Sequence, residues 1–465
     1  MTRPVALLGA LLLAGCAAGP ARHIGTPAPE LPASFLYQPK AAEGAAVADL
    51  LPQNDRAFTV LAAAALARSP SLLEAIARID AARAGANRAG AERLPAIGAN
   101  GSVQVSRTNP DQFGSSLPPG ASLDTTRTQL GATVVASWDP DIFGRLRSQE
   151  RAARVRITAA DADAVAVRLA LTADIALAVI DQRTLAARKA AIESDAADAE
   201  ELARLAGVRE KAGIAPGFDR LRAETSVAAS RSRLEALSSE RARLIGRLVT
   251  LTAQPAEAVE QLLASSVPSR EAPPAPATLP SALLLNRPDI RAASARLAAS
   301  DYDLAATAAQ RFPRFDLSAA IGLLAFGIGG LFDTDAIVGS VGGTIAGPLL
   351  DFGRIAAEIE AAEAEKQAAF QRYRGAVYQA LGDSETGYAL VAAADREAGM
   401  AGAEADLSVR QARLAEIRYR AGLSDFIVVL EARRAADGSR ERDAAAQGRA
   451  RRARVLLWQA LGGHL

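Results

Sequence analysis

The chain has 465 residues, of which 53 are basic and 52 acidic, so it lacks the basic excess that is typical of nucleic-acid-binding proteins. Half of the residues are apolar but only 4% are aromatic, and alanine supplies much of the apolar fraction. This composition favours long, closely packed helices. Two histidines and one cysteine are too few for a His/Cys metal cage, a Ser-His-Asp triad or a disulfide framework. We therefore expect no enzyme activity, no catalytic residues, no metal site and no nucleic-acid partner.

Residues 1–15 have the pattern of a secretory signal peptide: Arg3, an apolar stretch over 5–13, and small residues before Cys16. The apolar stretch is shorter than the about 20 residues that cross a bilayer. The segment Leu13-Ala14-Gly15-Cys16 resembles the bacterial lipobox, after which the cysteine becomes an acylated first residue. We expect lipidation of Cys16 by diacylglycerol and an N-acyl chain such as palmitate, and no other cofactor. Ala17 stands where an aspartate retains bacterial lipoproteins at the inner membrane, which favours the outer membrane.

The segment 16–55 is rich in Pro, Ala and Gly and predicts an extended, lipidated tether. Helical pattern follows to about residue 93, with a break at Ser69-Pro70. Two stretches, about 96–107 and 128–138, then alternate between apolar and polar residues, which predicts strands. Phe143-Gly144-Arg145 opens a helix that reaches about residue 212, and a second helix reaches about residue 252. Six prolines mark 254–280 as a linker.

The same plan then repeats. Predicted strands at about 315–326 and 337–347 are followed by Phe352-Gly353-Arg354, which opens another long helix that Gly422 breaks. Both Phe143 to Phe352 and Gly213 to Gly422 are separated by 209 positions. The chain is therefore predicted to duplicate a unit of helix, β-hairpin and long helical hairpin, first over 56–253 and again over 281–465.

The helices carry apolar and charged patterns of their own. Apolar residues at a 3–4 spacing predict coiled packing in the second repeat, at Met400, Ala403, Leu407, Leu414, Ile417 and Ala421. Acidic residues are dispersed among arginines, which predicts solvated helix faces, and no carboxylate pair stands isolated in apolar surroundings. The glycine-rich stretch 322–347 has no Lys-Ser/Thr of a phosphate loop, so we interpret it as strand and turn.

The four alternating stretches are about as long as membrane-spanning strands, which need about 9–11 residues. Open strand edges are not tolerated in lipid, and known barrels start at about eight strands, so one chain cannot close a barrel. Two copies would give an eight-stranded barrel, and side chains would largely fill its lumen. Three copies would give twelve strands and an open pore. A helical bundle without a membrane would have no use for four strands with apolar faces.

On these features the chain resembles the bacterial outer-membrane efflux proteins, the TolC/OprM-like factors. The resemblance rests on the duplication, on the paired Phe-Gly-Arg segments, on Arg287-Pro288-Asp289-Ile290 and on the hairpin tips at 210–224 and 416–434. It covers essentially the whole mature chain, and the lipobox points to the lipoprotein branch of tripartite RND-type efflux systems.

The resemblance implies a mainly α fold with a membrane β-barrel: a homotrimer with a twelve-stranded barrel and an α-helical periplasmic tunnel. It implies a lipid-anchored protein of the cell outer membrane that extends into the periplasm and passively conducts drugs, toxic organics or metal ions. Its implied partners are outer-membrane lipid, a periplasmic adaptor (membrane fusion protein) and an inner-membrane RND-type pump. Two alternatives stay open: an exit duct for type I protein secretion, and a lipid-anchored periplasmic coiled-coil scaffold without a pore.

The resemblance also implies an aperture just after the two hairpin turns. Matching the tips residue by residue places Asp219 at the acidic position of the first repeat, and Tyr419 and Glu431 at the tyrosine and an acidic position of the second. Ser424 stands where some relatives carry a basic gate residue, and Arg418 or Arg420 could supply that charge. The alternative is that Asp219 and Glu431 are ordinary solvated helix charges.

Overall fold

The computed structural model describes residues 30–39, 46–109, 126–214, 216–265 and 273–463. The predicted signal peptide, Cys16 and half of the tether lie outside these ranges. The chain divides into a sheet unit (residues 80–159 and 294–371) and a helical unit (residues 28–79, 160–293 and 372–465), which are described in turn.

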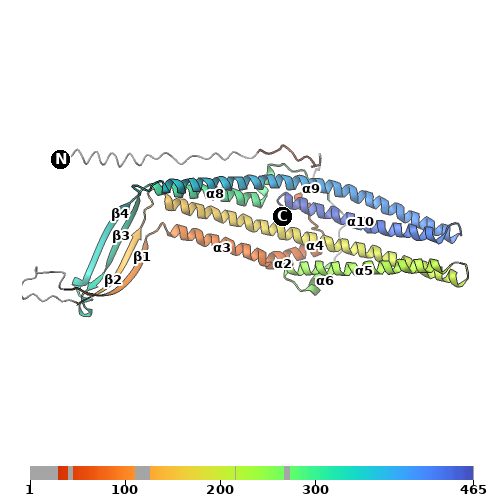
Figure 1. Cartoon of the computed structure of the whole chain (residues 1–465), viewed down its shortest axis with the longest axis horizontal. Coiled ribbons are helices and arrows are strands. Elements are labelled where there is room, and N and C mark those ends of the chain that lie inside the picture. Colours follow the sequence, from red (N-terminus) through yellow and green to blue (C-terminus); the bar gives the residue numbers. More distant parts are fainter. Residues whose placement is uncertain (1–29, 40–45, 110–125, 215, 266–272, 464–465) are drawn as a thin grey trace, which may run out of the picture. The chain divides into compact units, whose positions relative to one another are not determined.

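Helices make up most of the described chain, and four strands form its one sheet (Figure 1). The helices are η1 (Val47–Leu50), α2 (Arg56–Arg68), α3 (Pro70–Ala91), α4 (Arg145–Lys211), α5 (Gly217–Thr252), α6 (Ala256–Ser265), α7 (Ala282–Asn286), α8 (Pro288–Ala308), η3 (Ala309–Arg311), η4 (Ile328–Gly330), η5 (Thr334–Ala336), α9 (Arg354–Arg420) and α10 (Phe426–Ala460). The strands are β1 (Ala96–Arg107), β2 (Thr126–Trp138), β3 (Arg314–Ala325) and β4 (Ile337–Ala346).

The two long helices α4 and α9 repeat each other at the 209-residue offset seen in the sequence. Each has 67 residues, which corresponds to about 100 Å at 1.5 Å per residue. Each begins after a glycine with positive φ, Gly144 at +75° and Gly353 at +88°, and ends before another, Gly213 at +69° and Gly422 at +74°. Side chains with a Cβ rarely adopt this backbone conformation, so glycine sets both ends of both helices.

Within the described residues no single helix is both long and apolar enough to cross a bilayer. Only α2 and α3 taken together, bent by 41° at their junction, meet the same length and composition criteria.

The sheet unit is built around four antiparallel strands in the order β1-β2-β3-β4. Each repeat supplies one hairpin, and β2 pairs with β3 to join them; Val134 lies opposite Ala99 of β1 and Ile321 of β3. The strands are tied to the adjoining helices, because the Trp138 indole N–H donates to the Arg93 carbonyl at 2.9 Å. The Phe143 and Phe312 rings also stack at 4.7 Å, where the two repeats meet.

The helical unit has a continuous apolar core to which α2, α4, α5, α9 and α10 contribute. Its largest fully buried side chains include Trp458, Tyr388 and Ile175. The core also fixes the described part of the proline-rich segment: Tyr388 donates its hydroxyl proton to the Pro276 carbonyl at 2.9 Å, and Arg454 donates to the Pro273 carbonyl at 2.6 Å.

Three expectations from the sequence differ from the structure. The described part of 16–55 is not an extended tether, because 47–50 forms η1 and because Phe35, Leu50 and Leu51 are buried in the core.

The segment 254–280 is not only a linker, because 256–265 forms α6; this stretch contains no proline, and Val259 and Leu263 bury their side chains in the core. The 3–4 stripe on α9 does not pack inside the chain, because Met400, Leu407 and Leu414 are each more than half exposed. The smaller Ala405, Ala412 and Ala415 face inward instead and let the helices approach closely.

Candidate functional site

One face of the sheet is continuously apolar. The register aligns the apolar residues of all four strands, because residues that pair across neighbouring strands point to the same side. Most of these side chains are exposed, including Ile97, Val103, Val105, Val134, Ile321, Val341 and Ile345. Such an extended apolar surface is characteristic of contact with lipid or a partner.

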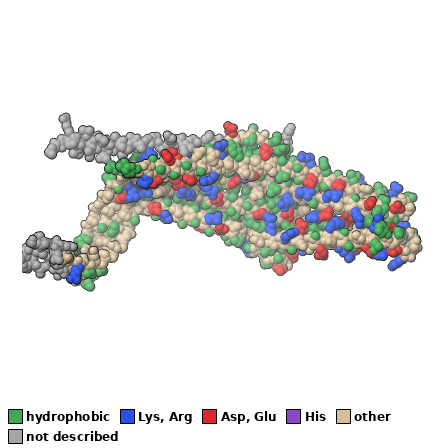
Figure 2. All heavy atoms as spheres, viewed as in Figure 1, with side chains coloured by type: hydrophobic (Ala, Val, Ile, Leu, Met, Phe, Trp, Pro, Cys, Tyr) green, Lys and Arg blue, Asp and Glu red, His purple; other side chains and the backbone are tan. Residues whose placement is uncertain are grey.

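The opposite face of the sheet carries the polar side chains together with glycine, alanine and the apolar Val135, Leu324 and Val338, and charges are confined to strand ends. Its side chains include Asn100, Ser102, Gln104, Thr133, Ser137, Ser318, Ser340 and Thr344. Charged residues within the four strands are limited to Arg107, Arg127, Arg314 and Asp316, near strand termini. Figure 2 shows the same contrast on its visible face, where Lys, Arg, Asp and Glu are scattered over the helices and sparse on the sheet. β1 and β4 are the two edges of this sheet.

The two helical hairpins, α4–α5 and α9–α10, run side by side and end in turns of the same design (Figure 1). The Gly213 and Gly422 amides bond to carbonyls three residues back, and the following Ile214 and Leu423 amides bond five residues back. These two hydrogen bonds satisfy the last carbonyl groups of each long helix and together form the Schellman motif.

Below the turns lies a buried group of side chains that we call the tip cluster. Its members come from α4, α5, α9 and α10: Leu202, Ala206, Ala223, Ala412, Ala415, Tyr419, Phe426, Val429, Leu430, Ala432 and Ala436. The cluster therefore packs the ends of the two hairpins together within one chain.

Of the predicted aperture residues, Tyr419 is buried in the tip cluster. Its ring makes an edge contact with Phe426 at 5.8 Å between centroids, and the Arg209 guanidinium lies 4.7 Å from its centroid. Because Arg209 belongs to the first repeat and Tyr419 to the second, this cation–π contact joins the two hairpins. The ring makes these contacts, not the hydroxyl group.

The other predicted residues are more accessible. Asp219 is partly exposed in the first turn of α5, where a carboxylate is favoured by the helix dipole. Glu431 and Arg418 are exposed, and Arg420 is exposed and ion-paired with Glu416 of its own helix. The structure thus gathers all five residues at the hairpin tips, but only Tyr419 connects the two hairpins.

A second contact between the hairpins was not predicted. Arg433 of α10 pairs with Asp198 of α4 at 2.6 Å and with Glu416 of α9 at 2.5 Å. No local pattern could have identified Arg433, because its partners lie 235 and 17 residues away in the chain.

The Arg433–Asp198 contact belongs to a series of charged contacts between α4 and α10 that we call the charge ladder. Further up the same helices, Arg188 pairs with Glu441 at 2.8 Å and Asp181 pairs with Arg452. One rung differs, because Asp195 of α4 lies against Asp437 of α10, and both are buried. The expectation of no buried carboxylate pair was therefore wrong; the two aspartates are far apart in sequence, so no local pattern shows the pair.

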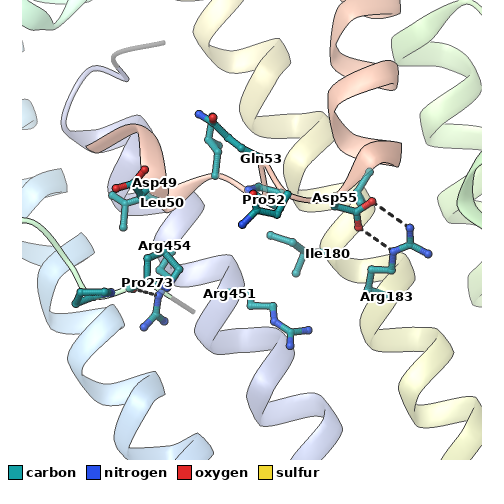
Figure 3. A pocket seen from close by; sticks show the side chains of 14 residues that line it. Asp49, Leu50, Pro52, Gln53, Asp55, Ile180, Arg183, Pro273, Arg451 and Arg454 are labelled. Carbon is teal, nitrogen blue, oxygen red and sulfur yellow. Dashed lines mark hydrogen bonds and ion pairs between the residues drawn. The ribbon is translucent and has the colours of Figure 1, made fainter. Parts of the chain in front are cut away.

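A cavity of about 550 Å³ lies in the helical unit between the segment 49–55, α4, α10 and Pro273-Pro274 (Figure 3). Two of the arginines that line it are neutralised, Arg183 by Asp55 at 2.9 Å and Arg454 by Asp395 at 2.7 Å. Burial and the nearby Arg454 lower the pKa of the third, Arg451. The Arg183–Asp55 pair attaches the N-terminal segment to α4, and the Arg454–Asp395 pair joins α10 to α9. Arg454 also holds the proline-rich segment through its hydrogen bond to the Pro273 carbonyl. Across the part of the chain that the structure describes, no group of three or more His, Cys, Asp or Glu side chains could hold a metal ion.

Comparison with known proteins gives a consistent result over most of the chain. The profile of the outer membrane efflux protein family matches residues 61–254 and 279–463, which correspond to the two repeats. Pyoverdine export outer membrane protein OpmQ of Pseudomonas aeruginosa is 29% identical over 401 residues, covering 86% of this chain and 83% of the relative. Outer membrane protein OprJ of the same species is 29% identical over 471 residues, covering 98% and 95%.

Solved structures agree with this assignment. The outer-membrane channel OprN superposes with a TM-score of 0.84 at 27% identity, covering 97% of this chain and 99% of that one. The outer membrane protein VceC from Vibrio cholerae gives a TM-score of 0.79 at 27% identity, covering 90% and 98%. The chain therefore belongs to the outer membrane efflux protein family, and its function is efflux through the outer membrane.

Proposed function

We propose that this protein is the trimeric, lipid-anchored exit duct of a tripartite efflux pump. The observation that carries the proposal is the sheet, which combines an exposed apolar face, a polar opposite face and two open edges. In hydrocarbon each unpaired backbone group costs several kcal/mol, so the edges β1 and β4 must find partners before the sheet can enter a membrane. Three copies supply twelve strands, enough for a closed barrel with a polar, water-filled interior.

The exposed stripe on α9 supports the same assembly. Met400, Leu407, Leu414 and Ile417 are each more than half exposed along one side of the helix. A heptad-spaced apolar stripe is the surface by which helices pack into coiled coils. In the trimer, a neighbouring copy covers this stripe, and the hairpins together enclose a periplasmic tunnel.

The lipid anchor and the energy source for transport both lie outside the described residues. Cys16 carries the diacylglycerol and N-acyl chains, which hold the N-terminus at the outer membrane from the periplasmic side. The duct itself conducts passively. A periplasmic adaptor docks on it, and an inner-membrane RND-type pump supplies the driving force.

The cargo is of low molecular weight. Relatives are named for the export of pyoverdine, for a solvent efflux pump and for a toluene efflux pump, so we propose small organic molecules as the substrate class. A polar barrel interior and a tunnel lined by solvated helix faces suit diffusion of such solutes with their hydration shells.

Conductance tests the proposal directly. The purified lipidated protein, reconstituted in planar bilayers, should form channels, and SDS gels of unheated samples should show a trimer that heating converts to monomer. A monomer that binds membranes only through its lipid, without conductance, would instead support the scaffold without a pore.

Glu431 tests the aperture. Threefold symmetry turns its exposed carboxylate into a ring of negative charge in a narrow neck, which attracts polyvalent cations. We expect a trivalent cation added on the periplasmic side to block the channel, and Glu431→Ala to weaken this block. Glu404→Ala is the matched control, because Glu404 is also an exposed helix acid but is already neutralised by Arg442 at 2.5 Å. Equal block of the wild-type and Glu431→Ala channels would show that Glu431 is an ordinary solvated helix charge.

A further inference from the structure

The charge ladder between α4 and α10 contains one rung of like charge. Its other rungs place acid against base: Asp181 with Arg452, Arg188 with Glu441, and Asp198 with Arg433. Between the last two, Asp195 meets Asp437, and the side chains are almost completely buried, with 1% and 8% of their residue surfaces exposed.

The surroundings do not solvate two negative charges. Apart from the hydrogen bond between the two acids themselves, no group among the described residues donates to the buried carboxylate oxygens of Asp195 or to the Oδ1 of Asp437. Apolar residues lie on both sides along the helices, with Ile192 one turn away on α4 and Ala436 next to Asp437 on α10. Two ionised carboxylates in contact at low dielectric repel strongly, so the stable form of such a pair holds one proton.

Charged groups from the neighbouring helices act on the pair without pairing closely with it. Arg440 of α10 lies at 4.0 Å from Asp195 Oδ1, the longest of the ion-pair distances in the ladder. Arg233 of α5 attracts Asp195 but is bound to Ser230 at 3.0 Å and faces Glu441. Arg433 acts on Asp437 from α10 but is shared between Asp198 of α4 and Glu416 of α9, and Asp198 adds repulsion.

Burial is the largest influence on both acids. It raises the pKa of Asp195 to about 8, helped by the hydrogen bond to Asp437 and by the negative charge of Asp437. Burial raises the pKa of Asp437 as well, whereas the hydrogen bond from Asp195 acts in the opposite direction. Asp195 therefore keeps the proton and donates it to the Asp437 carboxylate.

We propose that Asp195 and Asp437 form a proton-binding site that clamps the first helical hairpin to the second, and that release of its proton to solvent loosens α4 from α10. No bond other than O–H is broken, and the released proton enters water. The remaining dianionic pair repels itself and takes up water, so contact at this rung is lost while the opposite-charge rungs persist.

The direction of the pH dependence follows from linkage. The unfolded chain releases this proton near the ordinary aspartate pKa of 3.8, whereas the folded chain retains it to about pH 8. The stabilisation by the protonated pair is therefore complete below about pH 3.8 and declines as pH rises, until it is lost above about pH 8. Over the alkaline half of this window, ordinary aspartates and glutamates do not titrate.

The test is the thermal unfolding midpoint of the full-length protein in detergent micelles, followed from about pH 6 to about pH 9. Wild type should lose thermal stability steadily as pH rises from 6 and level off above about pH 8. Asp195→Asn should abolish this loss, because the neutral amide still donates to Asp437 and has no proton to release. Asp181→Asn is the matched control: it breaks the Asp181–Arg452 rung of the same two helices, so it should lower stability and leave the alkaline loss in place.

An identical alkaline loss in wild type and Asp195→Asn would overturn the proposal, as would a flat wild-type profile. If Asp195→Asn fails to fold, infrared spectroscopy of the wild type decides, because the carbonyl stretch of a protonated carboxyl group should disappear across the same pH range. Absence of that band below pH 8 refutes the site. Neither measurement involves transport, so the outcome does not depend on the proposed duct.

Discussion

The apolar face of the sheet allows us to predict how much an arginine at Val134 would destabilise the protein in a membrane. This residue lies four positions from Trp138 on β2 and pairs with Ile321 on β3. Tryptophan is enriched at membrane interfaces, so in the proposed barrel we expect Trp138 to mark the periplasmic border of the membrane band. At about 3.4 Å per residue and a strand tilt of about 40°, Val134 lies about 10 Å above that border, near the middle of a band about 25 Å tall.

Arginine at this depth faces hydrocarbon. We expect Val134→Arg to reduce the stability of the proposed barrel in the membrane by about 2–4 kcal/mol per subunit, a cost that the proposed trimer incurs three times. Leu317, although on the same face, pairs directly with Trp138 and so lies near the border. Leu317→Arg should therefore cost only about 0–1 kcal/mol per subunit.

The assay is denaturant titration of the protein folded into liposomes, together with the yield of heat-modifiable trimer. Ser318→Arg is the control, since Ser318 neighbours Leu317 but points to the polar face. Depth-dependent losses at Val134 and Leu317 with tolerance at Ser318 support a lipid-facing apolar surface. Losses of equal size at all three positions would refute the assignment of the two faces.

Three further outcomes are expected. Cys16→Ala should remove the acyl mass from the mature protein, while the proposed barrel still retains the protein in the membrane; mass spectrometry of purified protein decides. Tyr419→Leu should raise resting single-channel conductance, because it removes the contact with Arg209 that joins the hairpins, whereas Tyr419→Phe keeps the ring and should leave conductance near wild type. Gly322→Ala should reduce trimer yield, since its Cβ would lie 2.3 Å from the Ala132 carbonyl oxygen, whereas Gly339→Ala meets only an ordinary contact at 3.6 Å; equal yields would refute the steric argument.

The strands and their faces could be predicted because one local rule governs them. Polar and apolar residues alternate along each strand. When strands pair, their apolar sides must align on one face of the sheet, because any other register would place polar side chains on the apolar face. The long helices were predictable for a similar reason, since glycines with positive φ, such as Gly213 and Gly422, mark their ends in the sequence. Helix α6 was missed because the surrounding prolines obscure a ten-residue stretch that contains none.

Contacts between distant segments could not be predicted. The stripe at Leu407 and Leu414 is visible in the sequence, but its period is the same whether the partner is another helix of the chain or another copy. The position of Tyr419 at a hairpin tip follows from the resemblance, yet its contact with Arg209 depends on how two hairpins 200 residues apart pack. Asp195 and Asp437 likewise look like ordinary surface charges until the helices are placed together.

The equal length of α4 and α9 limits how such a chain can change in evolution. Removing one residue above Asp181 would turn the rest of α4 by about 100° and shift it by about 1.5 Å, which would bring every rung of the charge ladder out of register with α10. A compensating deletion in α9 would not repair contacts made by α4. Insertions and deletions within α4 must therefore preserve its register against α10, whereas the strand–loop–strand segments are free to differ in length. Pro95 and Pro313, which precede the strands, are 218 positions apart, whereas Phe143 and Phe352, which follow them, are 209 positions apart.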